Sequence, residues 1–286
     1  MITAVNRSMK TTQTIYKTIV YVVCIFLSLL SIFPFLNMVV NATRGTYEIQ
    51  QSAVSIIPST HLINNVKILM GKSFNPLIGF YNSMIIAVGA TVCALYFSSL
   101  TAYGLVAYEW KLRRVFFTII MFFLMLPVQV FTIGFYQFIY RIHWTNSHWP
   151  LILPAIATPA VVFFMRQYLL ATLSLDIVNS ARIDGAKEFY IFNRIVMPMM
   201  KPALAVQGIF IFVFNWNQLF LPLVLLTDSK KYTMPIMASL LRGDIYRTEY
   251  GAVYLALTLT VLPLFVVYFI LSKYIIAGVA LGALKE

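Results

Sequence analysis

Long uncharged apolar stretches alternate with short charged segments along the whole chain. A membrane-spanning helix needs roughly 20 predominantly apolar residues, and six of these stretches approach or exceed that length. We therefore predict six membrane-spanning helices. They cover about residues 18–40, 82–108, 115–140, 148–170, 203–227 and 251–272.

The composition assigns these stretches to a membrane instead of a soluble core. Hydrophobic residues make up 60% of the chain and charged residues only 10%, which leaves too little polar surface to enclose a water-soluble fold. A cleaved signal peptide is the alternative for the first stretch, but its apolar run is too long and no small-residue cleavage site follows it. We expect an all-α integral membrane protein with one domain over 18–275 and terminal segments at 1–17 and 276–286.

The fourth predicted helix should have an irregular beginning. Pro150, Pro154 and Pro159 lie in its first half, and each proline removes a backbone N–H and disturbs the preceding turn. A helix bundle tolerates such a kink where neighbouring groups bind the freed carbonyls.

The basic residues indicate the orientation and one class of partner. Six spans place both termini on one side, and with the termini in the cytoplasm thirteen of the 21 Lys and Arg residues face inward, as the positive-inside rule requires. The formal net charge is +12, yet the positive residues are scattered over many loops and form no stripe for nucleic acid. Anionic lipid headgroups are the expected partner of these charges.

No catalytic or metal site is expected in this chain. Cys24 and Cys93 fall within predicted spans, where they act as small apolar residues. The Gly-Lys-Ser at 71–73 has Val66 where a phosphate-binding loop needs glycine, and no strand precedes it. The histidines are expected to be solvated loop residues: His61, His143 and His148.

A polar segment at 172–202 interrupts the apolar pattern between the fourth and fifth spans. Ser174 can cap a short helix, Gly185 should end it, and Pro198 and Pro202 should stop a second amphipathic helix. A simple connection needs only a handful of residues. The segment is therefore expected to form a helix-turn-helix outside the bilayer that serves as a docking surface. An amphipathic hairpin resting on lipid headgroups is the alternative.

This segment resembles the cytoplasmic coupling motif of the permease subunits of bacterial ABC importers, in the carbohydrate branch of the maltose type. The family pattern is Glu-Ala-Ala, three residues, Gly, nine residues, Ile-x-Leu-Pro, and here Met197 stands for the leucine. Asn179 replaces the glutamate and Ser180 the first alanine. The resemblance assigns ATPase contacts to Asn179, Ser180, Ala181, Arg182, Asp184, Gly185, Ala186, Ile195 and Pro198. Similar likeness extends over the stretches 80–87, 163–169, 214–223 and 272–286.

The resemblance implies a pore subunit of an ATP-driven importer for a sugar or oligosaccharide in the bacterial inner membrane. Its implied partners are a second, similar permease, two ATPase subunits that hold ATP and Mg, and an external solute-binding protein. This chain would bind no cofactor and would not itself be an enzyme. An importer for another polar solute, such as a polyamine or phosphate, is one alternative. A self-sufficient secondary transporter is less favoured, because no charged residue lies in the middle of a span.

Two further segments are candidates for contact with the solute and its carrier. Asn215, Trp216, Asn217 and Gln218 lie within the fifth predicted span, where amides and an aromatic ring can face a sugar or can instead bind neighbouring helices. The apolar part of the loop 228–250 is too short to span the membrane, so we expect it to pack in the outer mouth of the pore or to reach into the docked solute-binding protein. The resemblance implies the contact with the solute-binding protein, and a re-entrant plug is the alternative. The contact residues expected in that loop are Met234, Pro235, Ile236 and Met237.

Overall fold

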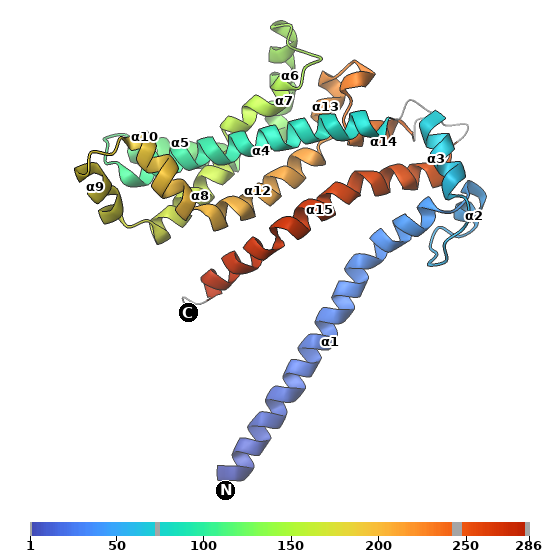
Figure 1. Cartoon of the computed structure of the whole chain (residues 1–286), viewed down its shortest axis with the longest axis horizontal. Helices are drawn as coiled ribbons and strands as arrows, with labels where there is room; N and C mark the ends of the chain where they lie inside the picture. The colour runs from blue at the N-terminus through green and yellow to red at the C-terminus, as the bar shows by residue number, and fades with distance from the viewer. Residues whose placement is uncertain (1, 72–74, 242–247, 284–286) are drawn as a thin grey trace. The chain divides into compact units, whose positions relative to one another are not determined.

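Every regular element that the structure describes is helical. The computed structural model describes residues 2–71, 75–241 and 248–283 (Figure 1). The chain divides into two compact units, residues 1–72 with 241–259 and residues 73–240 with 260–286. The expected all-α architecture is confirmed for the described residues.

The helices fall into these two units as follows. The first unit contains α1 (Ile2–Ala42), α2 (Thr46–Gln51), α3 (Leu62–Gly71) and the beginning of α15 (Tyr250–Ala283). The second unit begins with α4 (Pro76–Ala107), α5 (Arg113–Met125), α6 (Val128–Arg141), α7 (Trp149–Ile152), η1 (Leu153–Ile156) and α8 (Pro159–Thr172). It continues with α9 (Leu175–Ile183), α10 (Glu188–Ile191), η2 (Phe192–Val196), α11 (Met197–Met199), α12 (Lys201–Trp216), α13 (Phe220–Leu225), η3 (Ser229–Lys231), α14 (Met234–Leu240) and the rest of α15.

Between four and six of the described helical segments can cross a membrane by length and composition. Four single helices qualify: Ile15–Ala42, Pro76–Ala107, Trp149–Thr172 and Tyr250–Ile270. Two helix pairs qualify only if each pair counts as one bent span: Arg113–Met125 with Val130–Arg141, and Glu188–Met199 with Lys201–Trp216. The expected number of six is therefore the upper limit that the described residues allow.

The third expected span, 115–140, is not one straight helix. The segments Arg113–Met125 and Val130–Arg141 meet at an angle of 99°. Pro127 causes the break, because its ring disfavours the helical conformation in the residue before it. Leu126 accordingly adopts an extended conformation, with ψ 135°, and ends α5.

The fifth expected span, 203–227, is also wrong as a continuous helix. α12 ends at Trp216, and α13 begins only at Phe220. Pro222 explains the interruption, because a proline has no N–H for the carbonyl four residues earlier and its ring collides with that carbonyl. The carbonyl concerned belongs to Gln218, which lies in the break.

The expected irregularity at the start of the fourth span is confirmed. α7, the 3-10 turn η1 and α8 follow one another over 149–172, and Pro150, Pro154 and Pro159 each lie in the first turn of one of these helices. Proline is tolerated there because the first N–H groups of a helix have no intrahelical acceptor.

The two expected terminal segments, 1–17 and 276–286, are helical where the structure describes them, over 2–17 and 276–283. α1 is helical from Ile2, and its apolar part begins at Ile15. α15 extends to Ala283, beyond the expected end of the last span.

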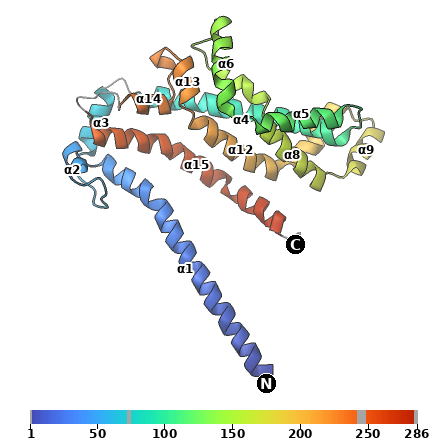
Figure 2. The same cartoon turned by 180° about the vertical axis from the view of Figure 1, so that it is seen from behind.

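α4 is the central helix of the second unit. Asn75 starts it by accepting hydrogen bonds from the N–H groups of Leu77 and Ile78, and Pro76 occupies the first turn. Fully buried small residues let α8 and α12 pack closely along it, as Figures 1 and 2 show from opposite sides. These small residues are Ala87, Ala90, Ala94, Ala102, Ser98 and Ser99.

Candidate functional site

The polar segment forms a helical hairpin, here called the polar hairpin and defined as residues 174–199. Ser174 caps α9 as expected, since its Oγ accepts a hydrogen bond of 3.3 Å from the N–H of Asp176. The Asp176 carboxylate also lies in the first turn, where it complements the positive end of the helix dipole.

Gly185 ends α9 in the left-handed conformation, with φ +79°. The N–H of Gly185 donates to Arg182 O, and the N–H of Ala186 donates to Ala181 O, both at 3.0 Å. This pair of bonds is the Schellman motif, which satisfies the last carbonyls of a helix and favours glycine. The expected break at Gly185 is confirmed, and it is a fixed turn because both bonds close it.

The second arm of the polar hairpin does not stop at Pro198. α10, the π-helical turn η2 and α11 follow without a gap from Glu188 to Met199, and Pro198 lies in the first turn of α11. The arm nevertheless ends one residue later, at Met199, so the expected end near the two prolines is confirmed although Pro198 itself lies within the arm. Pro202 lies in the first turn of α12, where a proline loses no intrahelical bond. The chain turns by 80° between Met199 and Lys201.

An ion pair joins the two arms of the polar hairpin. Arg182 Nε donates to Glu188 Oε1 at 2.6 Å, and Arg182 Nη2 donates to Glu188 Oε2 at 3.3 Å. Arg182 Nη1 also donates to Asn179 Oδ1 at 3.0 Å. The hydrogen bond from Arg182 is the main reason why the pKa of Glu188 is lowered. Glu188 thus supplies a negative charge beside the turn, although Asn179 is neutral at the position where the family pattern has glutamate.

The polar hairpin buries one side and exposes the other. Phe192 and Val196 are fully buried, whereas Ile183, Phe189 and Tyr190 are 87%, 66% and 58% exposed. An open groove of about 530 Å³ lies at the turn. Five of the expected ATPase-contact residues line it together with Lys187 and Tyr190: Ala181, Asp184, Gly185, Ala186 and Ile195. The arrangement combines a rigid turn, exposed apolar side chains and a groove, which are the features of a docking surface.

The four polar or aromatic residues of the expected fifth span separate into different environments. Trp216 is only 1% exposed, its Nε1 donates to Thr260 O at 2.9 Å, and its ring stacks on Phe212. Trp216 is therefore a core residue, and its ring has no open face for a solute in this conformation. Asn215 Nδ2 donates to Ile211 O on its own helix.

Asn217 and Gln218 lie in the break between α12 and α13. Since α12 ends at Trp216, Asn215 and Gln218 do not belong to one continuous helix. Asn217 is exposed and Gln218 half-buried, and their side-chain amides have no hydrogen-bond partner within the part of the chain that the structure describes. These two amides, unlike Asn215 and Trp216, are available to a polar solute.

The segment 228–240 is attached to the start of α4. Asn82 Nδ2 donates to Lys230 O at 2.9 Å and to Tyr232 O at 3.0 Å. The N–H of Met234 donates to Ser83 Oγ at 2.9 Å. The expected contact residues Met234, Ile236 and Met237 are buried within the chain, and only Pro235 is partly exposed. The first three hold α14 in place in this conformation.

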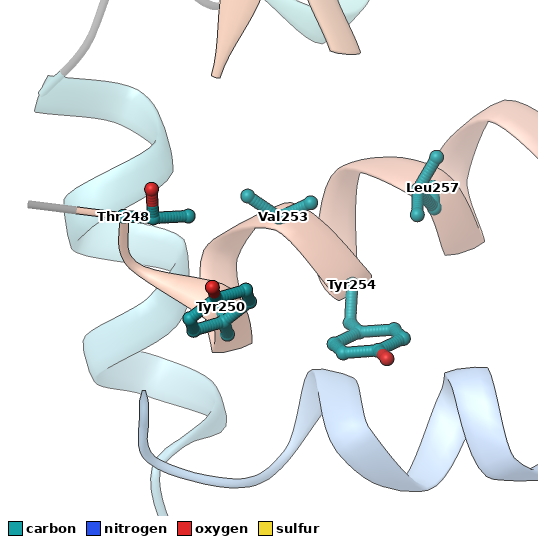
Figure 3. Close-up of a pocket in the computed structure, with 5 residues that line it drawn as sticks. All are labelled: Thr248, Tyr250, Val253, Tyr254 and Leu257. Atoms are coloured by element: carbon teal, nitrogen blue, oxygen red, sulfur yellow. The ribbon is translucent and has the colours of Figure 1, made fainter. Parts of the chain in front are cut away.

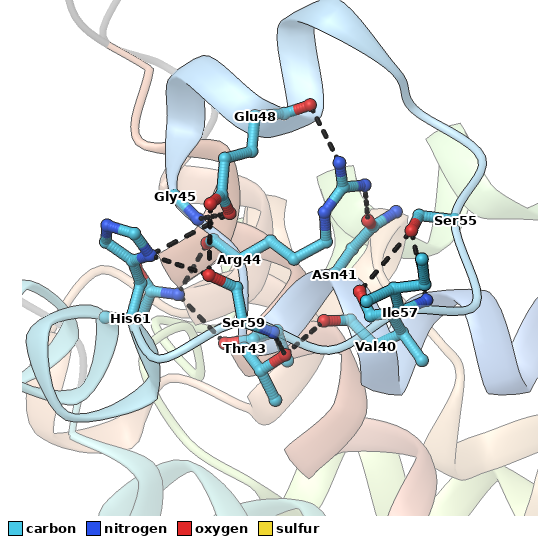
Figure 4. A network of polar contacts seen from close by, with 12 residues as sticks. Val40, Asn41, Thr43, Arg44, Gly45, Glu48, Ser55, Ile57, Ser59 and His61 are labelled. Carbon is cyan, nitrogen blue, oxygen red and sulfur yellow. Dashed lines mark hydrogen bonds and ion pairs between the residues drawn. The ribbon is translucent and has the colours of Figure 1, made fainter.

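A second polar network, which the sequence analysis missed, lies in the first unit and is here called the arginine cap (residues 41–61; Figure 4). Arg44 is only 8% exposed and donates to three acceptors at 2.8–2.9 Å: Asn41 Oδ1, Ser52 O and Glu48 O. The Glu48 carboxylate accepts from the Gly45 N–H and from Ser59 Oγ, both at 3.0 Å. The bond from the Gly45 N–H is the main cause of the lowered pKa of Glu48.

His61, expected to be solvated, is partly exposed and its Nδ1 lies 3.8 Å from Glu48 Oε2. In the described ranges no three His, Cys, Asp or Glu side chains could together hold a metal ion.

A pocket of about 300 Å³ opens at the start of α15, where the rings of Tyr250 and Tyr254 project one turn apart (Figure 3). Thr248, Val253 and Leu257 complete its lining.

Comparison with known proteins places this arrangement among transport permeases. Residues 94–280 match the family described as binding-protein-dependent transport system inner membrane component. The arabinooligosaccharides transport system permease protein AraQ of Halalkalibacterium halodurans is 32% identical over 263 residues, which are 91% of this chain and 93% of that protein. The lactose transport system permease protein LacG of Rhizobium radiobacter is 32% identical over 93% of this chain and 95% of its own length.

The fold is also similar to a solved structure. A chain in the crystal structure of a bacterial ABC transporter involved in the import of the acidic polysaccharide alginate superposes with a TM-score of 0.79. The match covers 92% of this chain and 98% of that chain at 21% sequence identity. At this identity the likeness is evidence for the shared fold.

Proposed function

Since the chain belongs to the binding-protein-dependent transport system inner membrane component family of ABC transporter permeases, we propose that it is the pore subunit of an ATP-driven importer for a sugar or oligosaccharide. The names of its relatives, which transport arabinooligosaccharides and lactose, support this substrate class. In this proposal the chain crosses the inner membrane six times, and both termini lie in the cytoplasm.

The polar hairpin is the observation that carries the proposal. It has a turn closed by two backbone hydrogen bonds and an ion pair across its arms, so a force applied at the turn moves the hairpin as one body. Its exposed apolar residues Ile183, Phe189 and Tyr190 are suited to a groove on an ATPase subunit. We assign ATP and Mg to two copies of that subunit and the other half of the pore to a second permease.

The solute pathway is assigned to the break between α12 and α13. Non-helical backbone at membrane depth is tolerated where it lines a water-filled cavity, and Asn217 and Gln218 add amide groups that can bind sugar hydroxyls. Asn215 binds its own helix, so it belongs to the structural part of this region. The external solute-binding protein is assigned to the side of the membrane that carries segment 228–240.

Purification of the tagged chain from its native membrane tests the assignment. We expect a second permease and an ATPase to co-purify, and the complex in proteoliposomes to take up oligosaccharide only with ATP and the solute-binding protein. Uptake driven by an ion gradient with no ATPase present would reject the proposal in favour of a secondary transporter. Uptake of a polyamine or phosphate in place of sugar would reject the substrate class alone.

Cysteine labelling tests the orientation. In a background without Cys24 and Cys93, exposed positions Gln50 and Lys230 should react with a membrane-impermeant thiol reagent in intact cells after substitution by cysteine. A cysteine at the exposed Lys187 in the polar hairpin should react only after the membrane is opened. The reverse pattern would invert the proposed topology.

A further inference from the structure

Three tyrosines, two in α4 and one directly after it, bind the second arm of the polar hairpin. Tyr96 and Tyr103 are seven residues apart on α4, so they lie on the same side of that helix, and Tyr108 follows its end. The Tyr103 hydroxyl donates to Glu188 Oε2 at 3.2 Å, and the Tyr108 hydroxyl donates to the same oxygen. The Tyr96 hydroxyl donates to Asn193 Oδ1 at 3.3 Å. We call this group the tyrosine clamp.

Aromatic packing reinforces the tyrosine clamp. Phe192 is fully buried, and its ring centroid lies 5.7 Å from that of Tyr96 and 5.6 Å from that of Tyr103. The Arg182 guanidinium lies over the Tyr108 ring at 5.1 Å. Glu188 therefore accepts from Arg182 in the first arm, from Tyr103 of α4 and from Tyr108 directly after α4. A single carboxylate thus connects both arms of the polar hairpin to the end of α4.

The opposite end of α4 holds the segment 228–240. Asn82 and Ser83 bind the backbone of residues 230–234, as described above. Asn82 is fourteen residues before Tyr96, so it lies on the same side of α4 as the tyrosines. α4 has 32 residues and is therefore about 48 Å long. One uninterrupted helix thus contacts the polar hairpin at one end and segment 228–240 at the other.

α8 also belongs to the buried cluster of the polar hairpin, through Met165 and Leu169, but it binds a different part of the second arm by hydrogen bond. The Tyr168 hydroxyl of α8 donates to Met199 O at 3.3 Å, at the far end of the second arm. α12 follows the hairpin in sequence, but only after the 80° bend. Among the described residues, the side-chain hydrogen bonds to Glu188 from outside the polar hairpin come from Tyr103 and Tyr108.

We propose that α4 is the rigid helix that transmits ATPase movement through this subunit. In this proposal, Glu188 and the tyrosine clamp connect α4 to the polar hairpin. Closure of the ATPases moves the hairpin, the clamp transfers this movement to α4, and α4 moves segment 228–240 on the opposite side. Glu188 is a positioning residue in this scheme. The inference rests on the proposed function, because it requires an ATPase at the polar hairpin.

The double variant Tyr103→Phe/Tyr108→Phe tests the clamp in the complete complex. It removes two hydroxyls while the ion pair between Arg182 and Glu188 remains. We expect the ATPase to co-purify normally, and its stimulation by the sugar-loaded binding protein to fall roughly tenfold, within the usual range for coupling between two sites. Tyr81→Phe is the matched control, because Tyr81 lies on the same helix and is 65% exposed; it should leave stimulation unchanged.

Substitutions of Glu188 distinguish positioning from folding. Glu188→Gln should lower stimulation, whereas Glu188→Asp, which keeps the carboxylate, should restore part of it at equal expression. Spin labels at Lys187 and Leu240 provide the direct measurement. On addition of ATP both labels should move in the wild-type complex, but only the Lys187 label in the Tyr103→Phe/Tyr108→Phe variant.

Each outcome decides a separate point. Equal movement of the Leu240 label and normal stimulation in the double variant would overturn the role of α4. Failure of any ATPase to co-purify with the wild-type chain would instead overturn the proposed function. If the double variant is not produced, Tyr96→Phe, which removes one hydroxyl, should still lower stimulation, and an unchanged value would overturn the inference.

Discussion

The arginine cap and the polar hairpin each contain a central arginine, but the contacts of the two arginines differ. Arg44 binds two backbone carbonyls and one side-chain oxygen, all within eight residues of itself. Arg182 binds the Glu188 carboxylate, which also accepts from tyrosines 80 and 85 residues away. The first network fixes a local fold, whereas the second joins separate elements. Damage to the first should therefore lower stability, and damage to the second should lower coupling.

Gly185→Pro should have the largest effect, because it breaks the polar hairpin at its turn. A proline requires φ near −65° and has no N–H, whereas Gly185 has φ +79° and donates to Arg182 O. We expect the helices to insert normally and ATP-dependent uptake to be lost. Gly185→Asn is the control, since asparagine tolerates the left-handed region, and it should keep most of the uptake. Normal uptake by the proline variant at equal expression would contradict a coupling role.

Arg44→Leu should have the next largest effect, and on stability instead of coupling. It leaves Asn41 Oδ1, Ser52 O and Glu48 O without this donor. The bond to Asn41 is buried, and a buried acceptor that loses its donor costs roughly 1–3 kcal/mol, whereas the other two bonds are only partly buried. We expect the free energy of unfolding in detergent to fall by about 3 kcal/mol. Stimulated ATPase activity per folded complex should not change. A drop in that ratio would show that the arginine cap also takes part in coupling.

Trp216→Phe sharpens the comparison by removing a long-range contact outside the polar hairpin. The variant keeps the aromatic stack on Phe212 but loses the bond from Nε1 to Thr260 O. We expect a loss of about 1 kcal/mol from the lost hydrogen bond, read from denaturant unfolding, with uptake per folded molecule unchanged. Reduced sugar affinity in this variant would place the ring in the solute pathway after all.

Glu48→Gln should have the smallest effect. Glutamine keeps an oxygen that can accept from the Gly45 N–H or Ser59 Oγ, so stability at neutral pH should fall less than in Arg44→Leu. Because the pKa of Glu48 is lowered in the folded chain, its charged form adds stability above the ordinary glutamate pKa of about 4.3. This contribution is lost as the pH falls through the lowered value. The unfolding temperatures of the wild-type protein and of Glu48→Gln should therefore converge only as the pH is lowered from 7 to below the lowered pKa of Glu48, and curves that stay parallel over that range would exclude this role.

The sequence was sufficient where the structure depends on neighbouring residues. The apolar stretches predicted helices long enough for a membrane, Ser174 predicted the start of α9, and Gly185 predicted its end. Each of these features follows from backbone hydrogen bonds and dihedral limits within a few positions. The interruption near Gln218 was equally local, because Pro222 was visible in the sequence and its effect on the fifth span was overlooked.

Only the tertiary structure decided which side chains meet. Glu188 was not among the predicted site residues, because its two tyrosine donors are 80 and 85 residues away in sequence. Trp216 was expected in the solute pathway and Met234 in contact with the solute-binding protein, yet packing in the second unit buries both side chains. An apolar or aromatic side chain has the same local signal whether it faces a solute, a partner or the core. Its environment is fixed by helix packing, which depends on side chains distant in sequence.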